Sequence, residues 1–492
     1  MPRTLTLSFL LLFFIYSYAQ TPLGNTIYGQ DGDQAGKAVA LSADGRTMAI
    51  GAPIYDNLVV GGGQVRVLRL DGGIWKPHGT DILGAQEVEF LGYQLDLSHN
   101  GNRIIIGTRF NSDSGRFAGK AFVLEFQNGN WQQLGSNITG QFPQDILGEG
   151  VSISGDGTRI AVGSPGFDAG GMDRGLIRVL EWKNGAWEQV GKDFLGEKDG
   201  SQLGRCMVLS TDGSILAIGD RRNADNGANA GQILIYQWSG TDWKQLGKGI
   251  KGEKEGSDFG GNIDFTSESM KLITSSREGA GATEDGRALI FEWKDNDWLQ
   301  VGKTILSKAI KDGSGTSVSI SADGNRVAFG APLFDLSDAR TGHARVYDWD
   351  ETDWLQYGAD FVGDSSLDDF GASVALSADG QTLAVGAPGN DFTGTNAGQV
   401  KAFDLRQSTS IDGAKALSPI SLYPNPTNER VYISSSQAGI QTIIMYDLHG
   451  RQLDIELDKQ FAKWSVRSQY KGFAILLIQT EEGFYREKVL FE

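Results

Sequence analysis

The chain has 492 residues, a formal net charge of -17 at pH 7, one cysteine and 68 glycines. Phosphate neutralisation needs clustered Lys and Arg, so this acidic balance argues against general nucleic-acid binding. A single cysteine, Cys206, excludes both an internal disulfide framework and a cysteine-based zinc site.

The first segment, residues 1–19, has the layout of a secretory signal peptide. Arg3 supplies a positive start, residues 5–16 form an apolar run of twelve, and Ser17-Tyr18-Ala19 offers the small residues that a signal peptidase reads. A membrane anchor would need about 20 apolar residues. We therefore predict cleavage between Ala19 and Gln20, and a mature chain that is exported and has no transmembrane span.

Residues 20–405 repeat one unit seven times. Three ladders recur with a step of 55 or 56 residues. They are tryptophans (Trp75, Trp131, Trp187, Trp243, Trp298, Trp354), glycines that open apolar runs (Gly63, Gly119, Gly175, Gly231, Gly286, Gly342, Gly398) and turn pairs (Asp44-Gly45, Asn100-Gly101, Asp156-Gly157, Asp212-Gly213, Asp323-Gly324, Asp379-Gly380). The fifth copy departs from the last ladder, with Glu268-Ser269 in place of the pair.

Each unit is predicted to hold four strands in two hairpins. In the first unit these are 39–42, 47–52, 65–70 and a strand that begins at Trp75. Asp-Gly suits the first turn because a tight hairpin needs positive φ, which Gly accepts without strain. The second strand is apolar on both faces, as expected of a sheet that is covered on both sides. Such sheets repeated in a circle form a β-propeller, and a linear solenoid is the alternative.

The number of ladder positions favours the closed ring. Where the seventh tryptophan and its following glycine would fall, the sequence has Ser410 and Ala414. The missing positions occur at the other end, because Gly24 and Ile27 precede Gly79 and Ile82 by one repeat. We therefore predict an all-β, seven-bladed propeller whose N-terminal strand completes the last blade and removes the exposed strand edges.

The units resemble FG-GAP repeats, the propeller repeats also found in integrin α chains. Phe259-Gly260 and Phe370-Gly371 carry the first half of the motif. The second half stands at Gly51-Ala52-Pro53, Gly330-Ala331-Pro332 and Gly386-Ala387-Pro388. The resemblance implies a propeller that presents loops for binding, and it implies no particular reaction.

Two sets of loops are candidate cation sites. Calcium-binding members of the family carry a D-x-D-x-D-G loop, whereas the loop at 41–45 has a single carboxylate, so we predict no cofactor there. In the second loop Asp56, Asp168, Asp335 and Asp391 follow the GAP-like Pro by three residues, and Asn111 and Asn223 are assigned to equivalent places. They are interpreted as Asx-turn residues. The alternative is a ring of oxygen ligands for a cation such as calcium, or for a hydroxyl-rich ligand.

The remaining conspicuous residues favour structural roles. Trp182, Trp238, Trp293 and Trp349 precede the ladder tryptophans by five, which predicts cross-strand aromatic packing, with sugar stacking as the alternative. Cys206 is predicted to lie in the core. The four histidines share no metal spacing, and no catalytic triad, phosphate loop or pair of carboxylates stands out.

The chain changes character after the repeats. Residues 406–417 have the composition of a linker, and 418–492 are predicted to form a small β-sandwich with strands at 430–433, 442–446, 473–478 and 487–490. This tail resembles the C-terminal sorting domain of the type IX secretion system of the Bacteroidota. The matching residues are Leu422, Tyr423, Pro424, Asn425 and Pro426, the segment 446–451, Gly472, and Lys488, Val489 and Leu490. The resemblance implies export across the outer membrane, followed by secretion or attachment at the cell surface.

The predicted function is that of a non-catalytic binding or adhesion module, because seven near-equivalent units carry no unique polar cluster and an active site usually breaks such symmetry. The expected partners are the secretion machinery and an extracellular glycan or protein, and the protein is expected to be a monomer. The alternatives are an enzyme that acts on extracellular polysaccharide or peptide, and a structural component of the cell surface.

Overall fold

In a computed structural model the chain forms two compact units, Met1–Gln407 and Ser408–Glu492. The described residues are 21–56, 59–168, 170–277, 286–309, 311–335, 340–406, 420–423, 430–435, 440–447, 452–460, 463–480 and 483–491. The predicted signal peptide and residues 407–417 of the predicted linker at 406–417 lie outside them. All regular elements of the described residues are strands, and no helix there has the length and hydropathy needed to cross a membrane.

The first unit contains seven antiparallel sheets of five strands each. The strands of the first three sheets are β3 (Ala38–Leu41), β4 (Thr47–Ala52), β5 (Gln64–Asp71), β6 (Ile74–Pro77) and β7 (Ile82–Leu83); β8 (Gln94–Leu97), β9 (Arg103–Thr108), β10 (Lys120–Gln127), β11 (Asn130–Gln133) and β12 (Ile138–Thr139); β13 (Gly150–Ile153), β14 (Arg159–Ser164), β15 (Leu176–Lys183), β16 (Ala186–Gln189) and β17 (Phe194–Leu195).

The next three sheets repeat this order with small changes in strand length. Their strands are β18 (Cys206–Leu209), β19 (Ile215–Asp220), β20 (Gln232–Trp238), β21 (Trp243–Gln245) and β22 (Ile250–Lys251); β23 (Ile263–Thr266), β24 (Lys271–Arg277), β25 (Gly286–Lys294), β26 (Asp297–Gln300) and β27 (Ile305–Leu306); β28 (Ser317–Ile320), β29 (Arg326–Ala331), β30 (His343–Trp349), β31 (Trp354–Gln356) and β32 (Phe361–Val362).

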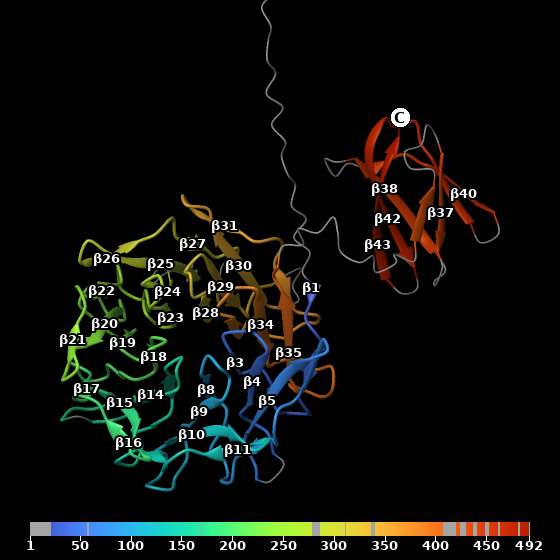
Figure 1. Ribbon diagram of the computed structural model, residues 1–492. Coiled ribbons are helices and arrows are strands. Elements are labelled where there is room, and N and C mark those ends of the chain that lie inside the picture. The colour runs from blue at the N-terminus through green and yellow to red at the C-terminus, as the bar shows by residue number, and fades with distance from the viewer. Residues whose placement is uncertain are drawn as a thin grey trace, which may run out of the picture. The chain divides into compact units, whose positions relative to one another are not determined.

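The seventh sheet joins both ends of the repeat region. Its inner strand is β33 (Ser373–Leu376), followed outward by β34 (Thr382–Ala387) and β35 (Gln399–Asp404), and its outer edge is formed by β1 (Thr21–Pro22) and β2 (Ile27–Tyr28). Thr21 pairs with Asp404 and Ile27 with Val400, so the N-terminal segment lies antiparallel to β35 (Figure 1). The predicted completion of the last blade by the N-terminus is confirmed.

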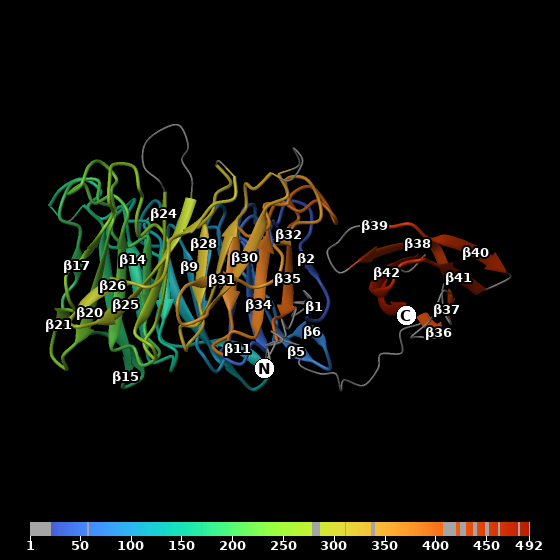
Figure 2. The same cartoon turned by 90° about the horizontal axis from the view of Figure 1, so that it is seen from above.

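The sheets form a closed ring, which confirms the seven-bladed propeller. Each inner strand contacts the next around the axis, and β33 contacts β3. At the end of the inner strands, Ala43 N donates to His99 O (2.8 Å), and Ala378 N of the last blade donates to Ala43 O (3.0 Å). Figure 1 views the ring along its axis, and Figure 2 shows the same blades from the side.

The outer strand differs from the prediction in one respect. In each blade the outer strand is split into two short strands. In the first blade these are β6 and β7, which both pair with β5. The split follows from Gly79, at which a Cβ atom would lie 2.8 Å from Cδ1 of Trp131 in the next blade. The backbone leaves the ladder at this glycine so that the neighbouring indole ring can lie against it.

The glycines of the FG and GAP halves hold adjacent blades together. At Gly163, in the GAP-like half of the third blade, a Cβ atom would stand 1.9 Å from the carbonyl oxygen of Gly204, the FG-type glycine of the fourth blade. The same approach joins the last blade to the first, at 2.1 Å between a Cβ at Gly386 and Gly36 O. Any side chain at these positions would push the blades apart.

The second unit contains two four-stranded sheets. One has the order β36 (Ile420–Tyr423), β37 (Arg430–Ser435), β41 (Lys463–Arg467) and β40 (Glu456–Gln460), and the other β39 (Gln452–Leu453), β38 (Ile440–Asp447), β42 (Gly472–Thr480) and β43 (Gly483–Phe491). Val431 and Val466 from the first sheet share one buried core with Met445 and Leu476 from the second. This arrangement is a small β-sandwich, as predicted, although β36, β39, β40 and β41 were not.

Candidate functional site

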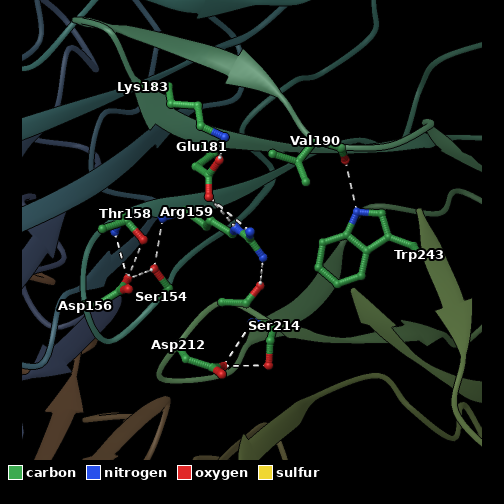
Figure 3. A network of polar contacts seen from close by, with 11 residues as sticks. Ser154, Asp156, Thr158, Arg159, Glu181, Lys183, Val190, Asp212, Ser214 and Trp243 are labelled. Atoms are coloured by element: carbon green, nitrogen blue, oxygen red, sulfur yellow. Dashed lines mark hydrogen bonds and ion pairs between the residues drawn. The ribbon is translucent and has the colours of Figure 1, made fainter. Parts of the chain in front are cut away.

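The Asp-Gly turns use their carboxylates within the turn. In the third blade Asp156 Oδ1 accepts hydrogen bonds from Ser154 Oγ (2.6 Å) and Thr158 N (2.9 Å), and Ser154 Oγ accepts from Arg159 N (2.9 Å). Ser210 and Asp212 repeat the pattern in the next blade. Figure 3 shows the first turn with Ser154, Asp156 and Thr158, and the contact of Asp212 with Ser214 in the second. The lone carboxylate therefore stabilises the hairpin.

The four aspartates of the second loop are each bound to their own loop. The Oδ1 atoms accept from a backbone N–H five residues later, at 2.6 Å for Asp56, 3.0 Å for Asp168, 2.8 Å for Asp335 and 2.7 Å for Asp391. Among the described residues, no group of three or more His, Cys, Asp or Glu side chains is placed to share a metal ion. These four carboxylates are therefore turn residues, and they are not close enough together to share a metal ion.

The assignment of Asn111 and Asn223 to the same loop position was wrong by one residue. In the second blade the bond across five residues is made by Ser112, whose Oγ accepts from Phe117 N at 3.1 Å. Asn111 precedes it and accepts from Asp113 N at 3.0 Å, as Asn223 does from Asp225 N at 3.0 Å. Both asparagines are buried.

The ladder tryptophans lock each blade to the preceding one. The indole N–H of Trp243 donates to the carbonyl oxygen of Val190 at 3.0 Å (Figure 3), and that of Trp75 donates to Leu23 O at 2.7 Å, across the joint between the first and last blades. Their cross-strand partners pack as predicted, with 5.4 Å between the ring centroids of Trp238 and Trp243. These aromatic residues serve the scaffold.

Arginine side chains form a second set of contacts between blades. Arg159 pairs with Glu181 of its own sheet (3.0 Å) and donates through Nη1 to Gly213 O in the turn of the next blade (2.9 Å). Figure 3 places this guanidinium between the two turns. Arg103 and Arg326 make equivalent bonds, to Gly157 O and Gly380 O.

The inner strands line a central channel with a cavity of about 320 Å³. Asp96 and Asp264 occupy the same position on β8 and β23 and bridge to the next blade. Asp264 Oδ2 accepts from Ser319 Oγ (3.1 Å) and Ile320 N (2.9 Å). Burial raises the pKa of Asp264 to about 6, against the opposing hydrogen bonds and with help from the charge of Asp96. Burial also raises the pKa of Asp96.

The mouth of this channel, at the end opposite the Asp-Gly turns, breaks the symmetry of the repeat. Here the residue after each FG-type glycine differs in every blade, and we call these seven residues the mouth ring: Lys37, Tyr93, Glu149, Arg205, Gly261, Thr316 and Ala372. A cavity of about 220 Å³ at the entrance is lined by residues from all seven blades. A second cavity of about 190 Å³ adjoins it, lined in part by Glu149, Arg205 and Arg221.

Ion pairs organise one side of the mouth. Glu149 accepts from Arg205 Nη1 (2.7 Å) through Oε1 and from Arg109 Nη1 (3.1 Å) through Oε2. The Arg109 guanidinium also lies over the ring of Tyr93, 4.0 Å from its centroid. Burial lowers the pKa of Arg205; the charge of Glu149 opposes this shift, and the like charges of Arg221 and Arg222 add to it. Arg205 therefore lies near more arginines than carboxylates.

The mouth also corrects the prediction for Cys206 and identifies residues that were not predicted. Cys206 is partly exposed as a whole residue and lines both mouth cavities, but the protein around its thiol excludes water and raises the pKa of the thiol to about 12. Arg109 and Arg221 stand where other blades have the Pro of the GAP-like motif. That departure was a signal in the sequence, but their proximity to Arg205 depends on how the blades pack.

No curated protein matches the sequence of this chain. Among solved structures, the periplasmic gluconolactonase from Pseudomonas aeruginosa has 14% identity and a TM-score of 0.46, with 71% of this chain and 95% of that chain covered. Raptor from Chaetomium thermophilum has 12% identity and a TM-score of 0.49, with 79% of this chain and 29% of that one covered.

Family models match in both units. Residues 363–403 match the FG-GAP repeat, and residues 421–492 match the secretion system C-terminal sorting domain. The tail is a type IX sorting domain. The FG-GAP propeller is therefore a protein exported across the outer membrane, and it is either secreted or attached to the surface.

The structure describes part of the predicted sorting residues. In the sorting domain Tyr423 ends β36 and pairs with Tyr432 of β37, while Ala19, Gln20 and the segment Pro424, Asn425 and Pro426 lie outside the described residues. Lys488, Val489 and Leu490 lie on β43 and pair with β42, and Val489 is buried in the core of the sandwich. The last strand of the sorting domain thus belongs to its folded core.

Proposed function

We propose that the exported propeller is a non-catalytic binding module that holds an extracellular glycan or protein ligand at its channel mouth. The proposal rests on a difference between the repeated residues, which hold the scaffold together, and the residues of the mouth ring, which vary from blade to blade. Side chains that recur from blade to blade, such as Asp156, Arg159 and Trp243, are used in turns and in contacts between blades. The mouth ring, in contrast, has a different residue in each blade.

This division supports binding because a specific ligand is not itself seven-fold symmetric. A surface that recognises it needs donors, acceptors and charges that differ from one place to the next. The mouth offers guanidinium groups, a carboxylate, an aromatic ring and side-chain amides within one pair of cavities. The sorting domain delivers such a surface to the cell exterior, where its partners would be other molecules of that space.

The buried carboxylates support a non-catalytic role. Asp264 has the raised pKa that a general acid could use, but its Oδ2 is occupied by Ser319 and Ile320, and its Oδ1 accepts from Phe265 N at 2.8 Å. Asp96 is engaged in the same way by Ser152 and Ile153. Both carboxylates connect the inner strands of adjacent blades, so their acceptor atoms are used within the scaffold.

The test applies the mature full-length protein to an array of extracellular glycans and to surface-protein extracts, and assays the bound material for cleavage. We expect binding that saturates without release of reducing ends or peptides, and light scattering at the mass of a monomer. Release of products that a single Asp→Asn substitution abolishes would replace this proposal with an extracellular enzyme. A lack of any binding would leave a structural surface component.

A further inference from the structure

One side of the channel mouth contains a guanidinium group that makes no direct polar contact with the described residues. Within the described part of the chain, the side chain of Arg221 has no hydrogen-bond or ion-pair partner, although it lines the cavity of about 190 Å³ together with Arg205. The neighbouring Glu149 is already shared by Arg109 and Arg205, and its side chain is only 9% exposed. In the lining of this cavity two cations, Arg205 and Arg221, therefore stand beside one carboxylate, in a chain whose net charge is -17.

The geometry of this corner favours an anion with a flat, two-oxygen end. Glu149 and Gln202 hold Arg205 through two of its five N–H donors, at 2.7 Å and 3.1 Å. Arg205, which keeps its remaining donors, and Arg221 line the same cavity. Guanidinium groups bind carboxylates through paired parallel hydrogen bonds, and low local solvation strengthens such bonds.

The rest of the lining suits hydroxyl groups. The amide oxygen of Gln202 accepts from Arg205 Nε, which leaves its N–H donors, and Asn262 donates through Nδ2 to Gly315 O at 3.0 Å, which leaves its Oδ1 acceptor. Gln94 is exposed at the junction of the two cavities. Pockets for drug-sized ligands have volumes of roughly 300–1,000 Å³, so the cavity of about 190 Å³ suits a single compact polar unit.

Building on the proposed function, we propose that Arg205 and Arg221 bind the carboxylate of an acidic sugar, a hexuronate unit of an extracellular glycan, with Gln202 and Asn262 contacting its hydroxyl groups. Glu149 and Arg109 are positioning residues that hold Arg205. The remainder of the glycan would extend over the channel entrance, where Lys37 and Tyr93 lie.

The experiment measures binding of glucuronate, glucose and acetate to the mature full-length protein by calorimetry at low and at physiological salt. We expect glucuronate to bind at least about tenfold more tightly than either glucose or acetate, because it alone offers both the carboxylate and the hydroxyl groups. Added salt should weaken glucuronate binding. Equal binding of glucuronate and glucose, or of glucuronate and acetate, would overturn the proposal.

Two neighbouring arginines supply a matched pair of variants. Arg221→Gln should weaken glucuronate binding by about tenfold, whereas Arg222→Gln, which makes the same charge change at an exposed residue outside the cavity lining, should change it less than about twofold. Because Arg221 has no partner in the described structure, its substitution should leave the melting temperature unchanged. Arg221→Lys should restore binding only in part, since an ammonium group cannot pair bidentately.

The outcomes separate this inference from the proposed function. Equal loss of binding in both glutamine variants would mean a general charge effect and would overturn the inference. A ligand found on the array whose binding is unaffected by Arg221→Gln would also overturn the inference while the propeller remained a binding module.

Discussion

Asp96 and Asp264 show how single side chains organise the centre of the ring. Each accepts a backbone N–H from the inner strand of the next blade, at 2.9 Å in both cases. The serine of that blade extends the connection, since Ser152 Oγ accepts from Leu209 N and Ser319 Oγ from Leu376 N, both at 3.1 Å. Each aspartate thus begins a chain of hydrogen bonds through three consecutive blades, which supplies partners for N–H groups of the inner strands.

Asp264 should make the propeller more stable at mildly acidic pH. Burial raises its pKa from 3.8 to about 6, so its contribution to stability is fully present below pH 3.8 and is lost as the pH rises through about 6. The shift of about two units corresponds to about 3 kcal/mol. Chemical denaturation should show that Asp264→Asn reduces the gain in unfolding free energy between pH 7.5 and pH 4.5.

Asp323→Asn is the control for this pH effect. Burial alone would raise the pKa of Asp323, but hydrogen bonds from Ser321 and Asn325 outweigh burial and lower it below 3.8. Its titration therefore lies outside the tested window, and the substitution should leave the difference between pH 7.5 and pH 4.5 unchanged. An equal effect of both substitutions would contradict the role given to Asp264.

Contacts between sheets account for stability at the scale of the blade. Arg159→Met should lower the unfolding free energy by about 2 kcal/mol, because it removes the bond to Gly213 O and leaves the half-buried Glu181 with Lys183 alone. Arg174→Met removes the exposed pair with Asp199 and should cost less than about 1 kcal/mol. Urea denaturation compares the two, and equal losses would refute the contact between blades.

Much of this architecture could be predicted from the ladders. Trp75, Gly79 and Asp44 recur because each makes a contact or a turn that every blade needs, so the number of blades and the closure by the N-terminus follow from spacing. The ion pairs of Glu149 at the mouth could not be predicted in the same way, because Arg109 and Arg205 belong to different blades and meet only through packing. The error at Asn111 has a similar origin, since Ser112 replaces the carboxylate and conceals the loop register.

The whole ring depends on its N-terminal segment. Deleting residues 21–29 should lower the melting temperature sharply, because β35 loses its outer partners and Trp75 loses the carbonyl oxygen of Leu23. Trp75→Phe keeps the strand pairing but removes that hydrogen bond and part of the buried ring, and it should cost about 1–3 kcal/mol. Calorimetry distinguishes the two variants, and an unchanged melting temperature after the deletion would show that the last blade is complete without it.

The propeller should fold without the sorting domain, whereas its export should require that domain. Removing residues 418–492 should leave a folded propeller, because the repeat region is a compact unit by itself. The truncated protein should accumulate in the periplasm, since the sorting domain directs passage across the outer membrane. Cell fractionation with a protease-resistance assay measures both properties, and normal surface delivery of the truncated protein would contradict the role of the tail.

Hydrogen bonds hold the backbone of Leu405, just after the last strand of the propeller, and this has a mechanical consequence. Leu405 N donates to Gln381 O (2.7 Å), and Leu405 O accepts from Tyr357 Oη (2.8 Å) and Arg326 Nη1 (3.3 Å). If the protein is tethered through the segment that follows, tension enters the ring at this residue. The load then spreads to two blades, and β35 can be pulled out only by shearing its hydrogen bonds to both β34 and the N-terminal strands. A tethered molecule should therefore resist drag without unravelling from its C-terminal end.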